Sequence, residues 1–352
     1  MKVFRFPLSL PKDSTEIQTM RKILIITIMT AIALNASAQI DLHSHAITKG
    51  YLDYIKANGA EMDEGFPIPA WDPEQHIAFM DKAGIQTAVL TMPAPQPYFG
   101  DAEASAAVCR RFNEECAALK ARYPGRFMFC AALPLPDVDA AIREAVYALD
   151  TLKADGIKLA TNVNGQYLGV PELDTLFSVL NERGAVVILH PHRPEPVNRQ
   201  VMQQTPLAMQ EYLSETTRAV ANMITCNVLA RYPQVKVVVP HCGAYLPLAV
   251  PRMKSLTAVM QANKMVGEID WQANLSSLYY DLAGAHSPEV IRMMLTITTP
   301  DHLLYGSDYP YVAPQVLVKS LHRMQQYLTD EPDLEPYKEM ILYKNALKLF
   351  HK

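Results

Sequence analysis

The sequence predicts an α/β fold, a (β/α)8 barrel, from three observations. Short runs rich in Val, Ile and Leu alternate with longer helical patterns, and eight such pairs can be counted along the chain. Most of the runs are continuously apolar, which is typical of parallel strands buried on both faces. A doubly wound open sheet is the alternative, but it normally carries a glycine-rich phosphate turn, and the sequence contains no Gly-x-Gly-x-x-Gly.

The expected elements follow one another in strict alternation. The strands are predicted at residues 40–43, 86–91, 126–131, 156–160, 186–190, 236–241, 278–282 and 302–305. The helices are predicted at residues 73–83, 102–123, 138–152, 171–183, 211–232, 247–263, 288–295 and 315–328. Pro73, Pro171 and Pro288 are placed like first-turn prolines. The two long connections, residues 46–72 and 191–210, are expected to form lids or substrate walls, because active sites lie at the carboxyl ends of barrel strands.

Composition excludes several classes of protein. The chain has 352 residues, 49% of them hydrophobic, and a formal net charge of −4, which fits neither a disordered chain nor a nucleic-acid binder. No nucleic-acid partner is therefore expected. The five cysteines form no Cys-x-x-Cys pair, so isolated buried thiols are expected rather than a disulfide scaffold or a cysteine zinc site.

The first 38 residues have the pattern of a secretory signal peptide. Arg21 and Lys22 precede an apolar run at residues 23–34, and Ala-Ser-Ala at residues 36–38 resembles a cleavage site. The run is too short for a membrane span, which needs about 20 residues. We therefore expect a periplasmic or secreted protein, not membrane-bound after cleavage, with one barrel domain at residues 39–352. Residues 1–19 look unlike a signal peptide's charged start, so Met20 is a candidate for the true first residue.

Four histidines and one aspartate lie where barrel strands end. His43 and His45 end the first strand, two residues apart and hence on one face. His190 ends the fifth strand, His241 ends the sixth, and Asp308 follows the eighth. In a barrel these side chains meet at one rim. Three imidazoles and one carboxylate form a nitrogen and oxygen site that suits Zn²⁺ or Mn²⁺. Such a site leaves coordination positions open for water or substrate.

These motifs resemble the amidohydrolase superfamily and, more closely, the aminocarboxymuconate-semialdehyde decarboxylase family. The resemblance covers essentially all of residues 39–352 and implies a barrel of the metallo-dependent hydrolase type. The segments that carry it are residues 40–45 (IDLHSH), 160–165 (ATNVNG), 190–191 (HP), 216–220 (TTRAV), 240–244 (PHCGA) and 305–310 (YGSDYP).

The resemblance implies one divalent metal, Zn²⁺ first and Mn²⁺ as the alternative, on His43, His45, His190 and Asp308. His241 would be an acid or base beside the metal, since imidazole titrates near neutral pH. Proton delivery to the substrate carbon is open among Asp308, His241 and a metal-bound water. Lys158 ends the fourth strand, where binuclear relatives place a carboxylated lysine; an ordinary rim lysine is the preferred interpretation.

The resemblance further implies a non-oxidative decarboxylase, a carboxy-lyase, of an aromatic or unsaturated carboxylic acid such as a hydroxybenzoate, and a homodimer. A metal-dependent hydrolase of a lactone, ester or amide is the alternative. A barrel that binds metal or ligand without catalysis is a second alternative, which the intact histidine set argues against.

Substrate contacts are the least specific part of the prediction. Arg193 and Arg218 are candidates to bind a substrate carboxylate, because guanidinium binds carboxylates through two hydrogen bonds, although structural ion pairs are equally compatible. Trp71 is the candidate for stacking on an aromatic ring. Further candidates for stacking, with lid packing as the alternative, are Tyr51, Tyr54 and Phe66. Of the remaining histidines, His192 and His286 are weaker pocket candidates, and His76 and His302 are expected to be structural or on the surface.

Overall fold

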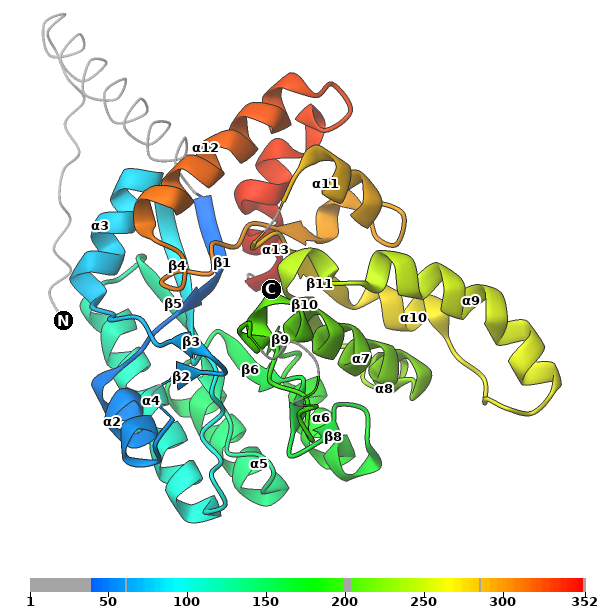
Figure 1. Ribbon diagram of the computed structural model, residues 1–352, viewed down its shortest axis with the longest axis horizontal. Coiled ribbons are helices and arrows are strands. Elements are labelled where there is room, and N and C mark those ends of the chain that lie inside the picture. Colours follow the sequence, from blue (N-terminus) through cyan, green and yellow to red (C-terminus); the bar gives the residue numbers. More distant parts are fainter. Residues whose placement is uncertain (1–38, 61, 199, 201–203, 285, 351–352) are drawn as a thin grey trace, which may run out of the picture. The chain divides into compact units, whose positions relative to one another are not determined.

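The computed structural model describes residues 39–60, 62–198, 200, 204–284 and 286–350 (Figure 1). The predicted signal peptide, residues 1–38, lies outside the described residues.

Eight parallel strands form one sheet in which each strand pairs with the next along the chain. They are β1 (Gln39–His45), β4 (Ile85–Thr91), β5 (Phe127–Ala132), β6 (Gly156–Ala160), β9 (Val186–His190), β10 (Lys236–Val239), β11 (Leu278–Asp281) and β12 (Leu303–Leu304). The sheet closes where the Leu42 N–H donates to the Tyr305 carbonyl at 2.9 Å and Ser44 pairs with Tyr309. The predicted (β/α)8 barrel is confirmed, and Figure 1 shows helices surrounding the strands.

Two clusters of apolar side chains hold the barrel together. The larger one lies between the strands and the helices around them. The smaller one joins residues of six strands, which only the barrel interior can bring together, and packs against α13 (Asn345–Phe350). Its strand residues are Ile40, Leu42, Val89, Cys130, Val186, Ile188, Val238 and Leu304. Burial on both faces explains why these strands are continuously apolar in the sequence.

The helices lie where the periodicity places them. They are α3 (Pro73–Ala83), α4 (Ala102–Arg122), α5 (Val138–Val146), α6 (Asp174–Glu182), α7 (Glu211–Thr225), α8 (Val228–Arg231), α9 (Leu246–Ala262), α11 (Pro288–Met294) and α12 (Pro314–Asp330). Pro73 and Pro288 do stand in first turns, behind the side-chain caps Asp72 and Ser287. Pro171 instead begins a short 3₁₀ turn before α6.

Three local features differ from the prediction. The helix expected at residues 211–232 is broken at Asn227, whose left-handed backbone (φ 52°) ends α7 and starts α8. The helix expected at residues 138–152 continues beyond α5 as a π-helical turn, Tyr147–Thr151. Three helices were not predicted: α2 (Lys49–Ala57), α10 (Trp271–Ser276) and α13 (Asn345–Phe350). The α2 helix lies inside the first long connection.

The two long connections contact each other. The first contains α2 and the hairpin of β2 (Met62–Asp63) and β3 (Phe66–Pro67). In the turn of that hairpin, the Glu64 carbonyl accepts a hydrogen bond from the Leu207 N–H at 3.1 Å, and the Glu64 carboxylate lies 2.8 Å from His192 Nδ1. Both Leu207 and His192 belong to the second connection, so the connections form one wall.

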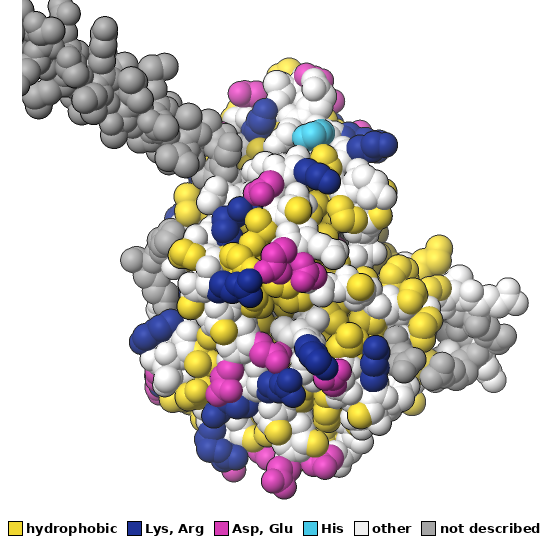
Figure 2. All heavy atoms as spheres, turned by 90° about the vertical axis from the view of Figure 1, so that its left-hand side faces the viewer, with side chains coloured by type: hydrophobic (Ala, Val, Ile, Leu, Met, Phe, Trp, Pro, Cys, Tyr) yellow, Lys and Arg dark blue, Asp and Glu magenta, His cyan; other side chains and the backbone are white. Residues whose placement is uncertain are grey.

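The surface and the thiols agree with the composition. Acidic and basic side chains are interspersed over the face in Figure 2. All five cysteines are free, four of them buried and Cys226 exposed. Among the described residues, no helix is long and apolar enough to cross a membrane.

Candidate metal centre

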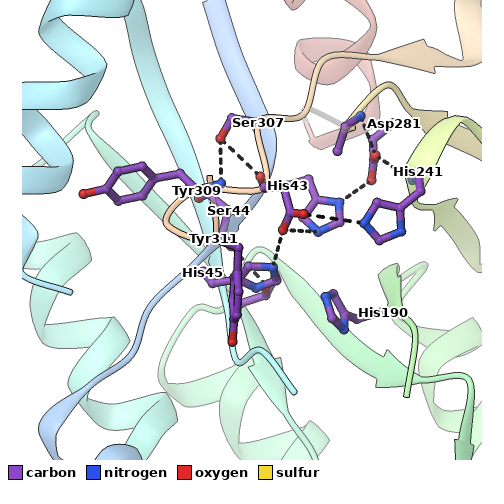
Figure 3. A network of polar contacts seen from close by, with 12 residues as sticks. His43, Ser44, His45, His190, His241, Asp281, Ser307, Tyr309 and Tyr311 are labelled. Carbon is purple, nitrogen blue, oxygen red and sulfur yellow. Dashed lines mark hydrogen bonds and ion pairs between the residues drawn. The ribbon is translucent and has the colours of Figure 1, made fainter. Parts of the chain in front are cut away.

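Three imidazoles from β1 and β9 converge at the rim of the barrel (Figure 3). The ligand atoms of His43, His45 and His190 all lie within 4.8 Å of one another, and the three side chains are at most 5% exposed. Asp308 Oδ1 lies 3.2 Å from His45 Nε2 and 3.5 Å from His43 Nε2. His43, His45, His190 and Asp308 could therefore hold one divalent ion, because Zn²⁺ accepts imidazole nitrogens and a carboxylate as ligands.

Each imidazole is anchored through its Nδ1 atom. His43 Nδ1 contacts Asp281 Oδ2 at 3.0 Å, and His190 Nδ1 contacts the Pro191 carbonyl at 2.8 Å. His45 Nδ1 contacts Thr91 Oγ1 at 2.8 Å, and that hydroxyl donates to the Ser44 carbonyl. These contacts place a proton on Nδ1 and turn the Nε2 atoms toward the centre, the orientation that metal-binding histidines have.

His43 Nε2 shows that a ligand is needed here. It is a buried atom without a hydrogen-bond partner among the described residues. Buried polar atoms in folded proteins are nearly always satisfied, so this nitrogen points to an absent partner. A divalent cation fits the arrangement, because anchored imidazole nitrogens and one carboxylate are its preferred ligands.

Asp281 holds two parts of the site, and sequence reasoning missed it. Its carboxylate is fully buried at the end of β11 and accepts hydrogen bonds from the His241 N–H at 3.1 Å and the Ala283 N–H at 3.0 Å, besides contacting His43. The sequence feature that could have identified Asp281 is its position as the last residue of the apolar strand Leu278–Asp281, like the other site residues at strand ends. Gly306 permits this packing, because a Cβ there would lie 2.7 Å from the His43 Cβ.

Asp308 is positioned by its backbone. Its N–H donates to the His43 carbonyl at 2.8 Å, and its φ of 63° lies in the left-handed region. Ser307 beside it donates to the buried Asp41 carboxylate at 2.5 Å, and Asp41 lies on β1 with the histidines. Left-handed backbone at a non-glycine residue costs free energy and recurs at functional sites.

The sequence predicts that His241 ends a strand at residues 236–241, but the observed strand β10 (Lys236–Val239) stops two residues earlier. The strand ends at Val239, and His241 begins a 3₁₀ turn with a left-handed φ of 55°. Its Nε2 atom lies 3.7 Å from Asp308 Oδ2, and its side chain is 16% exposed, more than the other three histidines. The turn therefore presents His241 to the cavity beside Asp308.

Burial and charge set the protonation of the centre. Burial lowers the pKa of His45 to about 4 and that of His190 well below its usual value, and both stay neutral. Burial also opposes protonation of His43, but the Asp281 carboxylate outweighs it and raises the pKa of His43 to about 9. Burial would raise the pKa of Asp308, yet the histidines beside it hold that pKa well below its usual value.

An apolar cavity of about 430 Å³ opens next to these residues. His190, His241 and Asp308 line it together with thirteen other residues, most of them apolar. Phe66 of the first long connection and Met209 of the second contribute to its wall, as expected for those connections.

Of the predicted substrate contacts, Phe66 lines this cavity, whereas Arg193, Arg218 and Trp71 lie outside its lining. Arg218 on α7 pairs with the buried Glu215 carboxylate and with the Tyr167 hydroxyl. Arg193 pairs with Glu195 at 2.6 Å. The indole N–H of Trp71 donates to His76.

The other four histidines considered from the sequence have structural contacts. His76 is buried with its ring against Tyr309, His192 contacts Glu64, and His286 lies between Tyr327 and Ser320. His302 stacks on Tyr279. Lys158 on β6 is buried, and its charge contributes to the lowered pKa values of His45 and His190.

Comparison with known sequences agrees with the site. The family described as Amidohydrolase matches residues 40–352. Decarboxylase yanB of Aspergillus niger is 33% identical over 325 residues, covering 89% of this chain and 87% of that protein. The 6-methylsalicylic acid decarboxylase of Penicillium expansum is 29% identical over 295 residues, covering 82% and 90%.

Solved structures share the fold. A crystal structure of an amidohydrolase II superposes with a TM-score of 0.81 at 28% identity, covering 90% of this chain and all of that one. The 5-carboxyvanillate decarboxylase LigW from Sphingomonas paucimobilis superposes with a TM-score of 0.78 at 20% identity, covering 89% of this chain and 98% of that one. Residues 40–352 thus carry the sequence pattern, the barrel and the histidine cluster of one family: this chain belongs to the amidohydrolase family.

Proposed function

We propose that the protein is a metal-dependent, non-oxidative decarboxylase of an aromatic carboxylic acid of the hydroxybenzoate type. The observation that carries the proposal is the set of three buried imidazoles, each anchored through Nδ1, that meets Asp308 beside an apolar cavity. Support comes from a relative named as a decarboxylase, which is 33% identical across most of both chains.

We propose His43, His45, His190 and Asp308 as the residues that hold one divalent ion, Zn²⁺ first and Mn²⁺ as the alternative. Two described clusters, one of His43, His45 and His190 and one of His43, His241 and Asp308, share His43 and support a single centre. When bound, the ion supplies a positive charge for the substrate carboxylate and for the negative charge that develops as carbon dioxide leaves.

His241, which lies beside the Asp308 carboxylate, supplies the proton. When the bond between the ring and the carboxyl carbon breaks, its electron pair stays on the ring carbon, and a proton must replace the departing carbon dioxide. His241 Nε2 and Asp308 Oδ2 lie 3.7 Å apart at the cavity wall, so this pair can hold and deliver that proton. The apolar walls limit water around the reacting carbon.

Two further parts of the proposal concern the cellular location and the oligomeric state of the protein. The signal-peptide pattern at residues 20–38 supports export to the periplasm or beyond. The family resemblance supports a homodimer. Fractionation of cells that express the full-length gene, and light scattering of the purified protein, test these two points.

The test measures carbon dioxide released from hydroxybenzoates, with 6-methylsalicylate and 2,6-dihydroxybenzoate as first substrates. The metal-loaded protein is expected to release one carbon dioxide per ring product, and chelation is expected to abolish release. His241→Asn is expected to lose turnover by at least a hundredfold while keeping the metal. Ring or ester opening with uptake of water, and no carbon dioxide, would indicate a hydrolase and refute the proposal.

A further inference from the structure

The cavity changes character from its floor to its mouth. At the floor lie His190, His241 and Asp308, the residues of the metal centre. At the mouth lie side chains with large exposed fractions: Met209 is 70% exposed, and Phe66 and Met293 are each 37% exposed. The wall between them is made largely of Leu213, Val290, Val312, Ala208, Ala244 and Ala283. An apolar channel therefore leads from the reacting centre to solvent.

The cavity is larger than one aromatic ring requires. An apolar cavity of about 150 Å³ holds benzene. At about 430 Å³, this cavity has roughly three times that volume. A benzoate bound by its carboxylate at the floor would leave most of the channel unfilled.

Among the described residues, the cavity lining provides no lysine or arginine that would bind a second anionic group on the substrate. The hydroxyl of Tyr311, one of the lining residues, donates to the Ala94 carbonyl at 3.2 Å. The unused space is thus suited to carbon rather than to charge.

We propose that the natural substrate is a monocarboxylic aromatic acid with an apolar substituent of several carbon atoms that occupies this channel. The inference rests on the proposed decarboxylase function and specifies its substrate class. The carboxylate lies at the floor, and the substituent extends past Val290 and Leu213 toward Met293. Burying each additional methylene group in such a wall is worth about fourfold in affinity.

The test is a series of 2-hydroxy-6-alkylbenzoates with methyl, propyl and pentyl groups, compared with 2,6-dihydroxybenzoate. The value of kcat/KM is expected to rise at least tenfold from methyl to pentyl and to be lowest for the dihydroxy compound. If the methyl compound is decarboxylated and the pentyl compound is slower, the inference is wrong and the decarboxylase function stands. If no compound releases carbon dioxide, the proposed function itself fails.

A matched pair of variants locates the effect. Met293→Glu places a carboxylate at the mouth of the channel, and it is expected to lower the pentyl-to-methyl ratio of kcat/KM at least tenfold. Met265→Glu makes the same change at a side chain that is 70% exposed and outside the lining, and it is expected to keep the ratio. An unchanged ratio in Met293→Glu, or an altered oligomeric state with an unchanged ratio, would overturn the assignment of the channel to substrate.

Discussion

Replacing Asp281 by Asn tests how the metal ligands are held. The Asp281 carboxylate is fully buried and touches His43 Nδ1 at 3.0 Å, while its other oxygen accepts two backbone hydrogen bonds. Asparagine has nearly the same shape but only one acceptor oxygen. If that oxygen keeps the two backbone bonds, the amide NH₂ faces His43 Nδ1.

The amide then changes which ring nitrogen of His43 carries the proton. Facing a donor, His43 Nδ1 must become an acceptor, so the proton moves to Nε2 and removes the lone pair that faces the metal. Loss of such a carboxylate beside a ligating histidine typically costs 10–100-fold in metal affinity. That factor corresponds to about 1.4–2.7 kcal/mol of binding free energy.

The assay is a competition between the protein and a metal-binding dye at neutral pH, with Zn²⁺ and then Mn²⁺. The matched control is Asp333→Asn, which removes a 55% exposed carboxylate paired with Arg292, and it should bind metal like the wild type. Thermal unfolding of both metal-free variants shows whether they are folded. A folded Asp281→Asn protein with metal affinity within threefold of the wild type would refute the reasoning.

Three further predictions concern stability and substrate contact. Gly306→Ala, whose new Cβ would lie 2.7 Å from the His43 Cβ, should lower the free energy of unfolding by about 1–3 kcal/mol in urea and reduce metal content; unchanged values would contradict this. Arg218→Ala should lower the melting temperature, because Arg218 pairs with the buried Glu215, and should leave KM within twofold; a tenfold rise in KM would instead show substrate contact. Burial lowers the pKa of His76 to about 3, below its unfolded value near 6.5. The unfolded chain therefore binds this proton first, and stability falls as pH drops below about 6.5, by up to about 1.4 kcal/mol per pH unit for this group. Urea unfolding at pH 7 and 5.5 should show a smaller pH dependence for His76→Phe than for the wild type.

Hydrophobic periodicity was sufficient to predict the barrel, because each strand or helix has a sequence pattern that lies within its own few residues. Strands such as Gly156–Ala160 and Val186–His190 were predicted to the residue, since both faces are buried and the apolar runs end at the rim. Because the carboxyl ends of all barrel strands meet at one rim, the sequence also predicted that the four histidines and Asp308 lie together. The α2 helix was missed because its core-facing residues Tyr51, Leu52, Tyr54 and Ile55 span little more than one helical turn, which is too short for periodicity to identify a helix.

Side-chain partners depend on contacts between distant segments, which the sequence does not display. Asp281 ends a strand as the other site residues do, but its role depends on the approach of His43, 238 positions earlier in the chain. Arg218 belongs to a segment typical of the family, yet its side chain pairs with Glu215 and Tyr167 rather than lining the cavity. The apolar channel could not be predicted, because separate connections and helices each contribute one or two side chains to it.

A single titration tests most directly whether decarboxylation depends on one bound metal ion per chain. Metal-depleted protein is mixed with increasing Zn²⁺ or Mn²⁺, and bound metal and carbon dioxide release from 6-methylsalicylate or its longer alkyl homologues are measured on the same samples. Release is expected to rise in proportion to bound metal and to reach its maximum at one ion per chain. Release that is independent of metal, or no release at full occupancy, would contradict this expectation.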